Sequence, residues 1–258
     1  HLDVQNILPP VPSPLPYEYR RWVRFLVFHD HETFRLGFRQ ERSHTQIEDD
    51  CLLISESSRA VVEELQVCLA AMTQMPAYLS SIEVRASDTF GNHMLIIKSP
   101  RMNQGQAESL LEVFQGIQSV VGCVVSAALP PSRRDHAPVR LVMGKDHLFE
   151  KFHAATFRIS DRSFMQANWP VYAMIYETLE EWAGECDGMK ILELYGGVGC
   201  LGLSLASKGA LVTLVEENPY AIADSRKSAS QNHIRRCRYR SVTAEKFLEN
   251  VQSKEYEV

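Results

Sequence analysis

A glycine-rich turn with a carboxylate downstream is the part of this sequence best suited to chemistry. Gly197 and Gly199 follow an apolar run at 190–194 and precede small and apolar residues. Glycines in such a turn let a ligand lie against bare main chain, and the helix start that follows offers free N–H groups. Glu216 ends the next apolar run, where a carboxylate can accept both hydroxyls of a ribose. The two features predict a ligand that contains adenosine, although such turns and strand ends also serve purely structural roles.

The order of residues in the turn separates two adenosine ligands. A dinucleotide-binding turn has the pattern Gly-x-Gly-x-x-Gly. This turn instead contains, in order, Glu193, Leu194, Tyr195, Gly196, Gly197, Val198 and Gly199. That order suits S-adenosylmethionine, which has no pyrophosphate for the turn to hold. We therefore expect a sulfonium nucleoside between the turn and Glu216.

Strands and helices alternate around the turn. The predicted elements are a helix at 171–182, strands at 190–194 and 211–216, helices at 201–206 and 244–251, and a basic strand before the last helix. Such alternation is typical of a parallel, doubly wound sheet. The sequence therefore predicts an α/β fold in which residues 156–258 form the first half of a Rossmann-like domain, cut at the fourth strand.

A different pattern precedes this region. Residues 1–16 are rich in proline, which predicts an extended linker. The elements expected next are strands at 20–30, 32–40, 81–86, 93–97 and 120–128, helices at 57–75 and 107–118, and a loop at 130–135. Residues 17–155 are thus predicted to form an α+β domain with mostly antiparallel strands.

Composition narrows the classes of function. Apolar residues make up 45% and charged residues 23% of the 258, as in soluble globular proteins. A net charge of −5 argues against a surface coated by nucleic acid but allows a local basic face. The longest uncharged apolar stretch, 120–129, is shorter than the roughly 20 residues of a membrane span. Six cysteines without CxxC spacing predict reduced thiols and a cytoplasmic location.

Three ordered blocks of the sequence resemble one family, the S-adenosylmethionine-dependent RNA uracil-C5 methyltransferases. The first block runs from Tyr19 to Cys51. The second, 157–168, has a phenylalanine, an apolar residue, glutamine and asparagine ahead of a helix. The third is the turn, with Glu193 where Asp is usual and Gly196 where Cys is usual. The resemblance covers nearly the whole chain and implies a class I methyltransferase fold that methylates a uridine in RNA, with ribosomal RNA preferred and transfer RNA as the alternative.

The resemblance also implies roles for single residues. Gln166 would contact the cofactor, and Tyr195 would line its methionine or adenosine pocket, together with Gly197 and Gly199. Glu216 would hold the ribose. The residue that reads the adenine stays unassigned, because Thr243 stands near the position where the family has an acidic residue and Glu245 follows two places on.

Catalytic residues are not expected within this chain. In the family, a cysteine adds to uracil C6, C5 then takes the methyl group, and a carboxylate removes the C5 proton. That cysteine lies in a Cys-Asn-Pro-like context, and none of the six cysteines here is followed by Asn-Pro. The chain also lacks an initiator Met and ends within what resembles the fourth strand. We therefore expect a truncated part of a longer enzyme, inactive alone.

Cys51 has two interpretations. In family members with a 4Fe-4S cluster, a cysteine at this position is the last of four thiolate ligands. The resemblance implies that role here only if three further cysteines lie before residue 1. On this chain alone, Cys51 is more simply a small buried thiol, and this possible cluster is the reason for preferring ribosomal RNA.

Basic residues gather on the hairpin predicted at 20–40. They alternate with aromatic residues, a combination that suits phosphate contact and base stacking. A solvated strand face is the structural alternative, and the resemblance favours RNA contact by Arg20 and Arg39. Two competing functions remain: a non-catalytic RNA-binding module that retains a cofactor fold, and a methyltransferase that acts on a small molecule.

Overall fold

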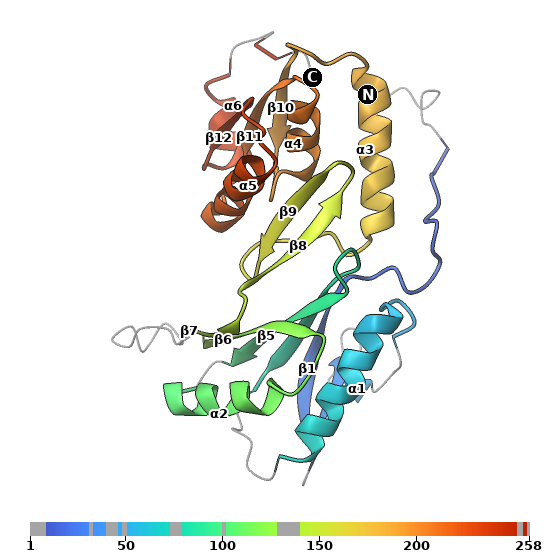
Figure 1. The fold of residues 1–258 in the computed structure, drawn as a ribbon, viewed down its shortest axis with the longest axis vertical. Coiled ribbons are helices and arrows are strands. Elements are labelled where there is room, and N and C mark those ends of the chain that lie inside the picture. Colours follow the sequence, from blue (N-terminus) through green and yellow to red (C-terminus); the bar gives the residue numbers. More distant parts are fainter. Residues whose placement is uncertain are drawn as a thin grey trace.

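The computed structural model describes residues 9–30, 33–39, 46–47, 51–72, 79–99, 102–127, 140–251 and 255–256. These residues form a seven-stranded sheet and a three-stranded sheet, with a two-stranded hairpin between them (Figure 1). Helices accompany both larger sheets, so the architecture is the mixed α/β type that the sequence predicts. Within the described residues, no helix is long and apolar enough to cross a membrane.

The seven-stranded sheet is built from the first half of the chain. Its strands are β1 (Trp22–Asp30), β2 (Thr33–Arg39), β3 (Gln46–Ile47), β4 (Ser81–Ser87), β5 (Asn92–Ser99), β6 (Val120–Ala127) and β7 (Arg140–Gly144), in the order β3-β2-β1-β4-β5-β6-β7. The predicted hairpins β1–β2 and β4–β5 are present. Only β5 and β6 pair in parallel among these strands, because α2 (Gln104–Phe114) connects them as a crossover.

Strand β4 is buried on both faces. Its side chains alternate between the two faces of the sheet, as in any strand. Ile82 and Val84 join the apolar core formed with α1 (Glu56–Ala70) and α2. Arg85 points the other way, toward the central hairpin, where it donates hydrogen bonds to backbone carbonyls. The charged face of β4 is therefore an internal contact and not a solvated one.

The central hairpin consists of β8 (His147–Phe152) and β9 (Ala155–Ser160). Phe152 and Phe157 lie in one apolar core with residues of the three-stranded half, including the fully buried Tyr176. Leu148 packs against the seven-stranded sheet instead. The hairpin therefore joins both halves, and the boundary predicted after residue 155 falls inside β9.

The three-stranded sheet carries the glycine turn. Its elements in chain order are α3 (Trp169–Ala183), β10 (Lys190–Leu194), α4 (Cys200–Ser207), β11 (Leu211–Val215), α5 (Pro219–Gln231), β12 (Cys237–Arg240) and α6 (Ala244–Leu248). The strands pair in parallel in the order β10-β11-β12. The carboxyl ends of all three strands therefore lie along one edge, next to the turn.

Element boundaries differ from the prediction at a few ends. Helix α2 begins three residues earlier than expected, because Asn103 and Gln106 form a capping box at its start. Helix α1 ends at Ala70, before the predicted end at Met75. The predicted loop at 130–135 and residues 1–8 of the predicted linker lie outside the described residues. Residues 9–16 contain neither helix nor strand.

Candidate functional site

The carboxylate of Glu216 ties the glycine turn to the start of α5. Its Oε2 accepts a hydrogen bond from the Gly197 N–H at 2.9 Å, and its Oε1 accepts one from the Asn218 N–H at 2.8 Å. The Gly196 N–H donates to the Val215 carbonyl, which holds the turn against the end of β11. Each carboxylate oxygen keeps a second lone pair. The group is therefore fixed in place and can still accept two further hydroxyls.

Two glycines of the turn serve different purposes. Both have a positive φ, +54° at Gly197 and +83° at Gly199, a conformation that disfavours side chains. A Cβ at Gly199 would come within 2.4 Å of the Ser225 Oγ, so this glycine allows close packing of α4, α5 and β11. A Cβ at Gly197 would meet no described atom within 4 Å. The open face of the turn is therefore at Gly197, beside Glu216, and it fits a nucleoside cofactor.

A second carboxyl group, Glu193, lies beneath the turn. The residue as a whole is half-buried, but its Oε2 is closed off from solvent and has no hydrogen-bond partner among the described residues. Burial raises the pKa of Glu193 to about 8, and the nearby Glu216 carboxylate also raises it, whereas the Gly202 backbone opposes the rise. Glu193 therefore keeps its proton to a higher pH than an ordinary glutamate does.

Tyr195 reaches across the strand ends. Its side chain is 71% exposed, and its hydroxyl donates to Glu245 Oε1 at 2.7 Å. Tyr195 follows β10, whereas Glu245 lies in α6, after β12. Thr243 is used differently, because its hydroxyl caps α6 by accepting from the Lys246 N–H. Glu245 is thus brought to the site, although sequence reasoning left its role unassigned.

The remaining predicted contact residues are spread more widely. Gln166 is exposed in the segment between β9 and α3, and its contact with a cofactor stays a prediction. The Arg20 N–H donates to the Leu53 carbonyl, and the Arg20 Nε is buried with no partner in the described part of the chain. Arg39 is exposed at the end of β2. Arg20 therefore has a structural task as well, and RNA contact by either arginine stays a prediction.

Cys51 packs partly buried against the core of the first half. Among the described residues, no group of three or more His, Cys, Asp or Glu side chains could hold a metal ion. The observed environment of Cys51 is that of a small apolar side chain.

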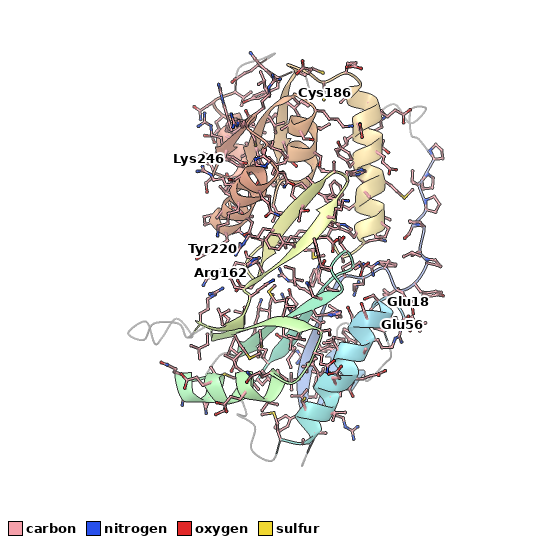
Figure 2. The ribbon with its side chains drawn as sticks, in the orientation of Figure 1. Glu18, Glu56, Arg162, Cys186, Tyr220 and Lys246 are labelled. Atoms are coloured by element: carbon pink, nitrogen blue, oxygen red, sulfur yellow. The ribbon has the colours of Figure 1, made fainter. Side chains whose placement is uncertain are left out.

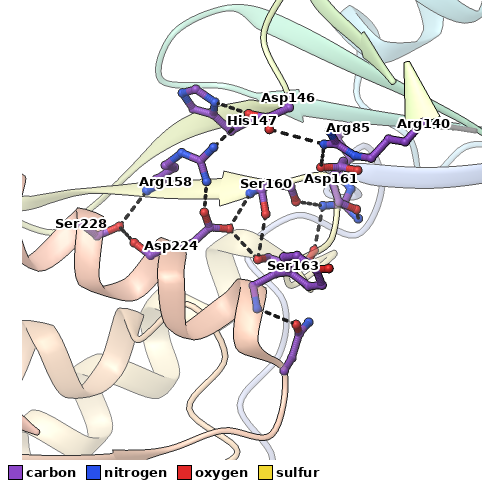
Figure 3. A network of polar contacts seen from close by, with 12 residues as sticks. Arg85, Arg140, Asp146, His147, Arg158, Ser160, Asp161, Ser163, Asp224 and Ser228 are labelled. Carbon is purple, nitrogen blue, oxygen red and sulfur yellow. Dashed lines mark hydrogen bonds and ion pairs between the residues drawn. The ribbon is translucent and has the colours of Figure 1, made fainter. Parts of the chain in front are cut away.

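A buried polar network joins the two halves and was not predicted from the sequence. Figure 3 shows Asp224 of α5 at its centre, paired with Arg158 and accepting from the Ser160 N–H and the Ser163 hydroxyl. Arg85 donates to the carbonyls of Ser160 and Ser163, each at 2.8 Å. Glu83 and Arg85 are the charged residues of β4, and charge within this buried strand was the sequence signal for an internal polar contact. The network fixes the three-stranded half of the structure against the seven-stranded sheet.

Burial alone would raise the pKa of Glu83, but Arg85 and Arg24 outweigh it and hold that pKa below its usual value. Arg24 donates to Glu83 Oε2 from two nitrogens, and Arg85 donates to Oε1 at 2.7 Å. Arg24, one of the basic residues on the hairpin predicted at 20–40, is thus paired with an internal carboxylate.

Comparisons with known proteins agree with this fold. No protein-family model matches the chain. It is 28% identical over 255 residues to an uncharacterized RNA methyltransferase of Lactococcus lactis, covering 94% of this chain and 55% of that protein. It is 24% identical over 259 residues to an uncharacterized RNA methyltransferase of Thermosynechococcus vestitus, covering 96% of this chain and 57% of that protein. The chain thus spans about half the length of the curated relatives it matches.

Among solved structures, the chain is similar to the tRNA (uracil-54, C5)-methyltransferase of Pyrococcus abyssi in complex with S-adenosyl-L-homocysteine. The TM-score is 0.74 at 20% identity, over 96% of this chain and 59% of that one. The similarity shows the fold: α/β, with a Rossmann-like sheet that carries the glycine turn, as the sequence predicted.

Proposed function

We propose that the protein is part of an S-adenosylmethionine-dependent RNA methyltransferase that acts on C5 of a uridine. The observation that carries the proposal is the Glu216 carboxylate, held by two backbone N–H groups beside the open face of Gly197. The RNA methyltransferase names of the relatives support an RNA substrate. The resemblance of residues 157–168 and 192–199 supports uracil C5, and so does the similarity to the tRNA (uracil-54, C5)-methyltransferase of Pyrococcus abyssi.

In this proposal, the chain holds the cofactor and the catalytic groups lie elsewhere. When bound, the cofactor supplies an electrophilic methyl group on a sulfonium. Glu216 accepts the two ribose hydroxyls, and Gly197 lets the nucleoside approach the main chain. Tyr195 and Gln166 line the site, as the resemblance implies. Because these groups contact the cofactor and not the uracil, cofactor binding can be measured separately from methyl transfer.

Three of the cysteines are poorly suited to be the nucleophile. A thiol must ionise to attack uracil C6. Burial raises the pKa of Cys200 well above its usual range, and that of Cys237 to about 11. In the first half, burial raises the pKa of Cys123 to about 12. These three thiols are therefore not candidates for the nucleophile, and none of the six cysteines stands in the Cys-Asn-Pro-like context of the family that the chain resembles.

Two RNA substrates are distinguished within the proposal. Ribosomal RNA is the first candidate and rests on the resemblance at Cys51. Transfer RNA is the second candidate, and it is favoured by the similarity in fold to the Pyrococcus abyssi enzyme, a tRNA (uracil-54, C5)-methyltransferase. A cytoplasmic location accompanies both. Methyl transfer from tritium-labelled cofactor, by protein expressed over its full reading frame, to separated ribosomal and transfer RNA pools decides between them.

Calorimetry with S-adenosyl-L-homocysteine tests the cofactor site directly. Replacing Glu216 by Ala or Gln removes the two charge-assisted hydrogen bonds proposed to the ribose hydroxyls, each contributing ~1.5–3 kcal/mol. We therefore expect the affinity for S-adenosyl-L-homocysteine to fall at least ~100-fold. The matched control is Glu217→Gln, an exposed carboxylate one residue on. No binding by the folded wild-type protein refutes the proposal. Cofactor and RNA binding without transfer by the full-length protein indicates a non-catalytic module, and transfer without RNA binding indicates a small-molecule substrate.

A further inference from the structure

An arginine stacked on a tyrosine lies directly beside the candidate cofactor site. The Arg162 guanidinium carbon is 4.3 Å from the centre of the Tyr220 ring. Figure 2 labels both residues where the first turn of α5 faces the segment after β9. The Asn218 side chain donates to the Arg162 carbonyl at 2.8 Å, and the Asn218 N–H donates to Glu216. One residue therefore links the stacked pair to the carboxylate proposed to hold the ribose.

A pocket of about 210 Å³ lies next to this pair. Its charged lining residues are Arg140, Arg158, Arg162, Lys227, Asp146, Asp161 and Asp224. The inner arginines are neutralised, because Arg140 pairs with Asp161 at 2.8 Å and Arg158 pairs with Asp146 and Asp224. Arg162 and Lys227 are exposed and have no acidic partner in the part of the chain that the structure describes. The positive charge of the rim is therefore available to an anion from outside.

We propose that Arg162 and Lys227, with Tyr220 as a platform, bind a backbone phosphate of the RNA strand next to the nucleotide to be methylated. This inference rests on the proposed function, which supplies the RNA. A guanidinium held over a ring by its carbon can still offer N–H groups to a phosphate, which it can bind with two hydrogen bonds. The pocket is smaller than the ~300–1,000 Å³ of most small-molecule sites and suits a phosphate group. A base drawn out of its RNA structure for methylation leaves neighbouring phosphates that need such a support.

The experiment measures RNA affinity against salt concentration. The probe is a fluorescein-labelled oligouridylate of about 12 nucleotides, a length within the site sizes of single-strand binding proteins. Each phosphate contact on a single strand contributes about 0.7 to the slope of log affinity against log salt. Arg162→Gln should therefore reduce the slope by about 0.7 and weaken binding about fivefold at 0.1 M salt. Because both side chains hold the same phosphate, the double variant with Lys227→Gln should lose about the same 0.7 in slope and no more.

Arg226→Gln is the matched control. Arg226 is also exposed and also stacks on a tyrosine, with its guanidinium carbon 5.0 Å from the centre of the Tyr239 ring, but it lies outside the pocket lining. We expect this variant to bind RNA as the wild type does. Tyr220→Phe should keep the platform and the affinity, whereas Tyr220→Ala should reproduce part of the Arg162→Gln loss.

The outcomes separate this inference from the proposed function. If Arg162→Gln, Arg226→Gln and the wild type all have equal slopes, the phosphate site is refuted and the proposed function is not. An equal loss of slope in both variants also refutes the site, because it indicates a diffuse attraction between the positive surface and the RNA. If the wild type binds S-adenosyl-L-homocysteine but no RNA, the RNA part of the proposed function fails and this inference fails with it. Cofactor affinity should be unchanged in Arg162→Gln, because its side chain is not part of the proposed cofactor site.

Discussion

Replacing Glu193 by Gln should make the stability of the protein less sensitive to pH. Glu193 lies in β10 under the glycine turn, where its Oε2 is shut off from solvent and unpartnered among the described residues. Burial raises its pKa to about 8 from an ordinary value of 4.5. The folded protein therefore keeps a proton that the unfolded chain releases.

The sign and size of the effect follow from this difference in proton binding. The stabilising contribution of Glu193 is fully present below pH 4.5 and is lost as the pH rises through about 8. One pKa unit corresponds to ~1.4 kcal/mol, so the free energy of unfolding should fall by up to ~4 kcal/mol between pH 5 and pH 9. A glutamine of the same shape carries no titrating proton, so that part of the pH dependence disappears.

Urea unfolding, followed by tryptophan fluorescence at pH 5, 7 and 9, measures the effect. The difference in unfolding free energy between Glu193→Gln and the wild type should grow in favour of the variant as the pH rises. Glu217→Gln, at an exposed carboxylate, should run parallel to the wild type. Parallel curves for Glu193→Gln as well would show that Glu193 is ionised in the folded protein and would refute the reasoning.

Three further predictions concern the turn, the polar network and the thiols. Gly197→Ala should lower stability by only ~1–2 kcal/mol but should weaken S-adenosyl-L-homocysteine binding at least tenfold. Gly199→Ala should lower the melting temperature, because the added methyl group clashes with neighbouring side chains. Wild-type affinity in Gly197→Ala would show that the cofactor binds elsewhere. Asp224→Asn should lower the free energy of unfolding by roughly 3 kcal/mol, because it removes a charge buried against Arg158; an unchanged urea midpoint would contradict this. Cys200 should resist a thiol reagent at pH 8 until the protein unfolds, because its thiol is buried and its pKa is raised; rapid labelling of Cys200 in the native protein would show that the turn opens.

Local patterns were sufficient to predict most elements and the glycine turn. The hairpin β1–β2 follows from period-two alternation, and β10, α4 and β11 follow from apolar runs separated by glycines. These signals lie within a few residues of the elements they define. The capping box at Asn103 was equally local, and reading it would have placed the start of α2 correctly.

Contacts between distant segments were not accessible in the same way. Arg85 and the Ser160 carbonyl that it binds are 75 residues apart, and no sequence period connects them. The central hairpin belongs to both halves through opposite faces, so a single boundary drawn along the chain passes through it. Glu245 reaches the site only because β12 is placed beside β11 and α6 turns back toward Tyr195.

The close approach of Glu193 to α4 ties two sequence positions together. An added Cβ at Gly202 would come within 2.3 Å of the Glu193 Oε2, so the long acid at one position requires the bare main chain at the other. A shorter acid at 193 would remove this closest approach, although the Val212 Cγ1, 2.9 Å from the same added Cβ, would still have to move. The residues at 193 and 202 should therefore covary across homologues. A double replacement that shortens the side chain at 193 and adds a methyl group at 202 should recover part of the stability that Gly202→Ala alone loses.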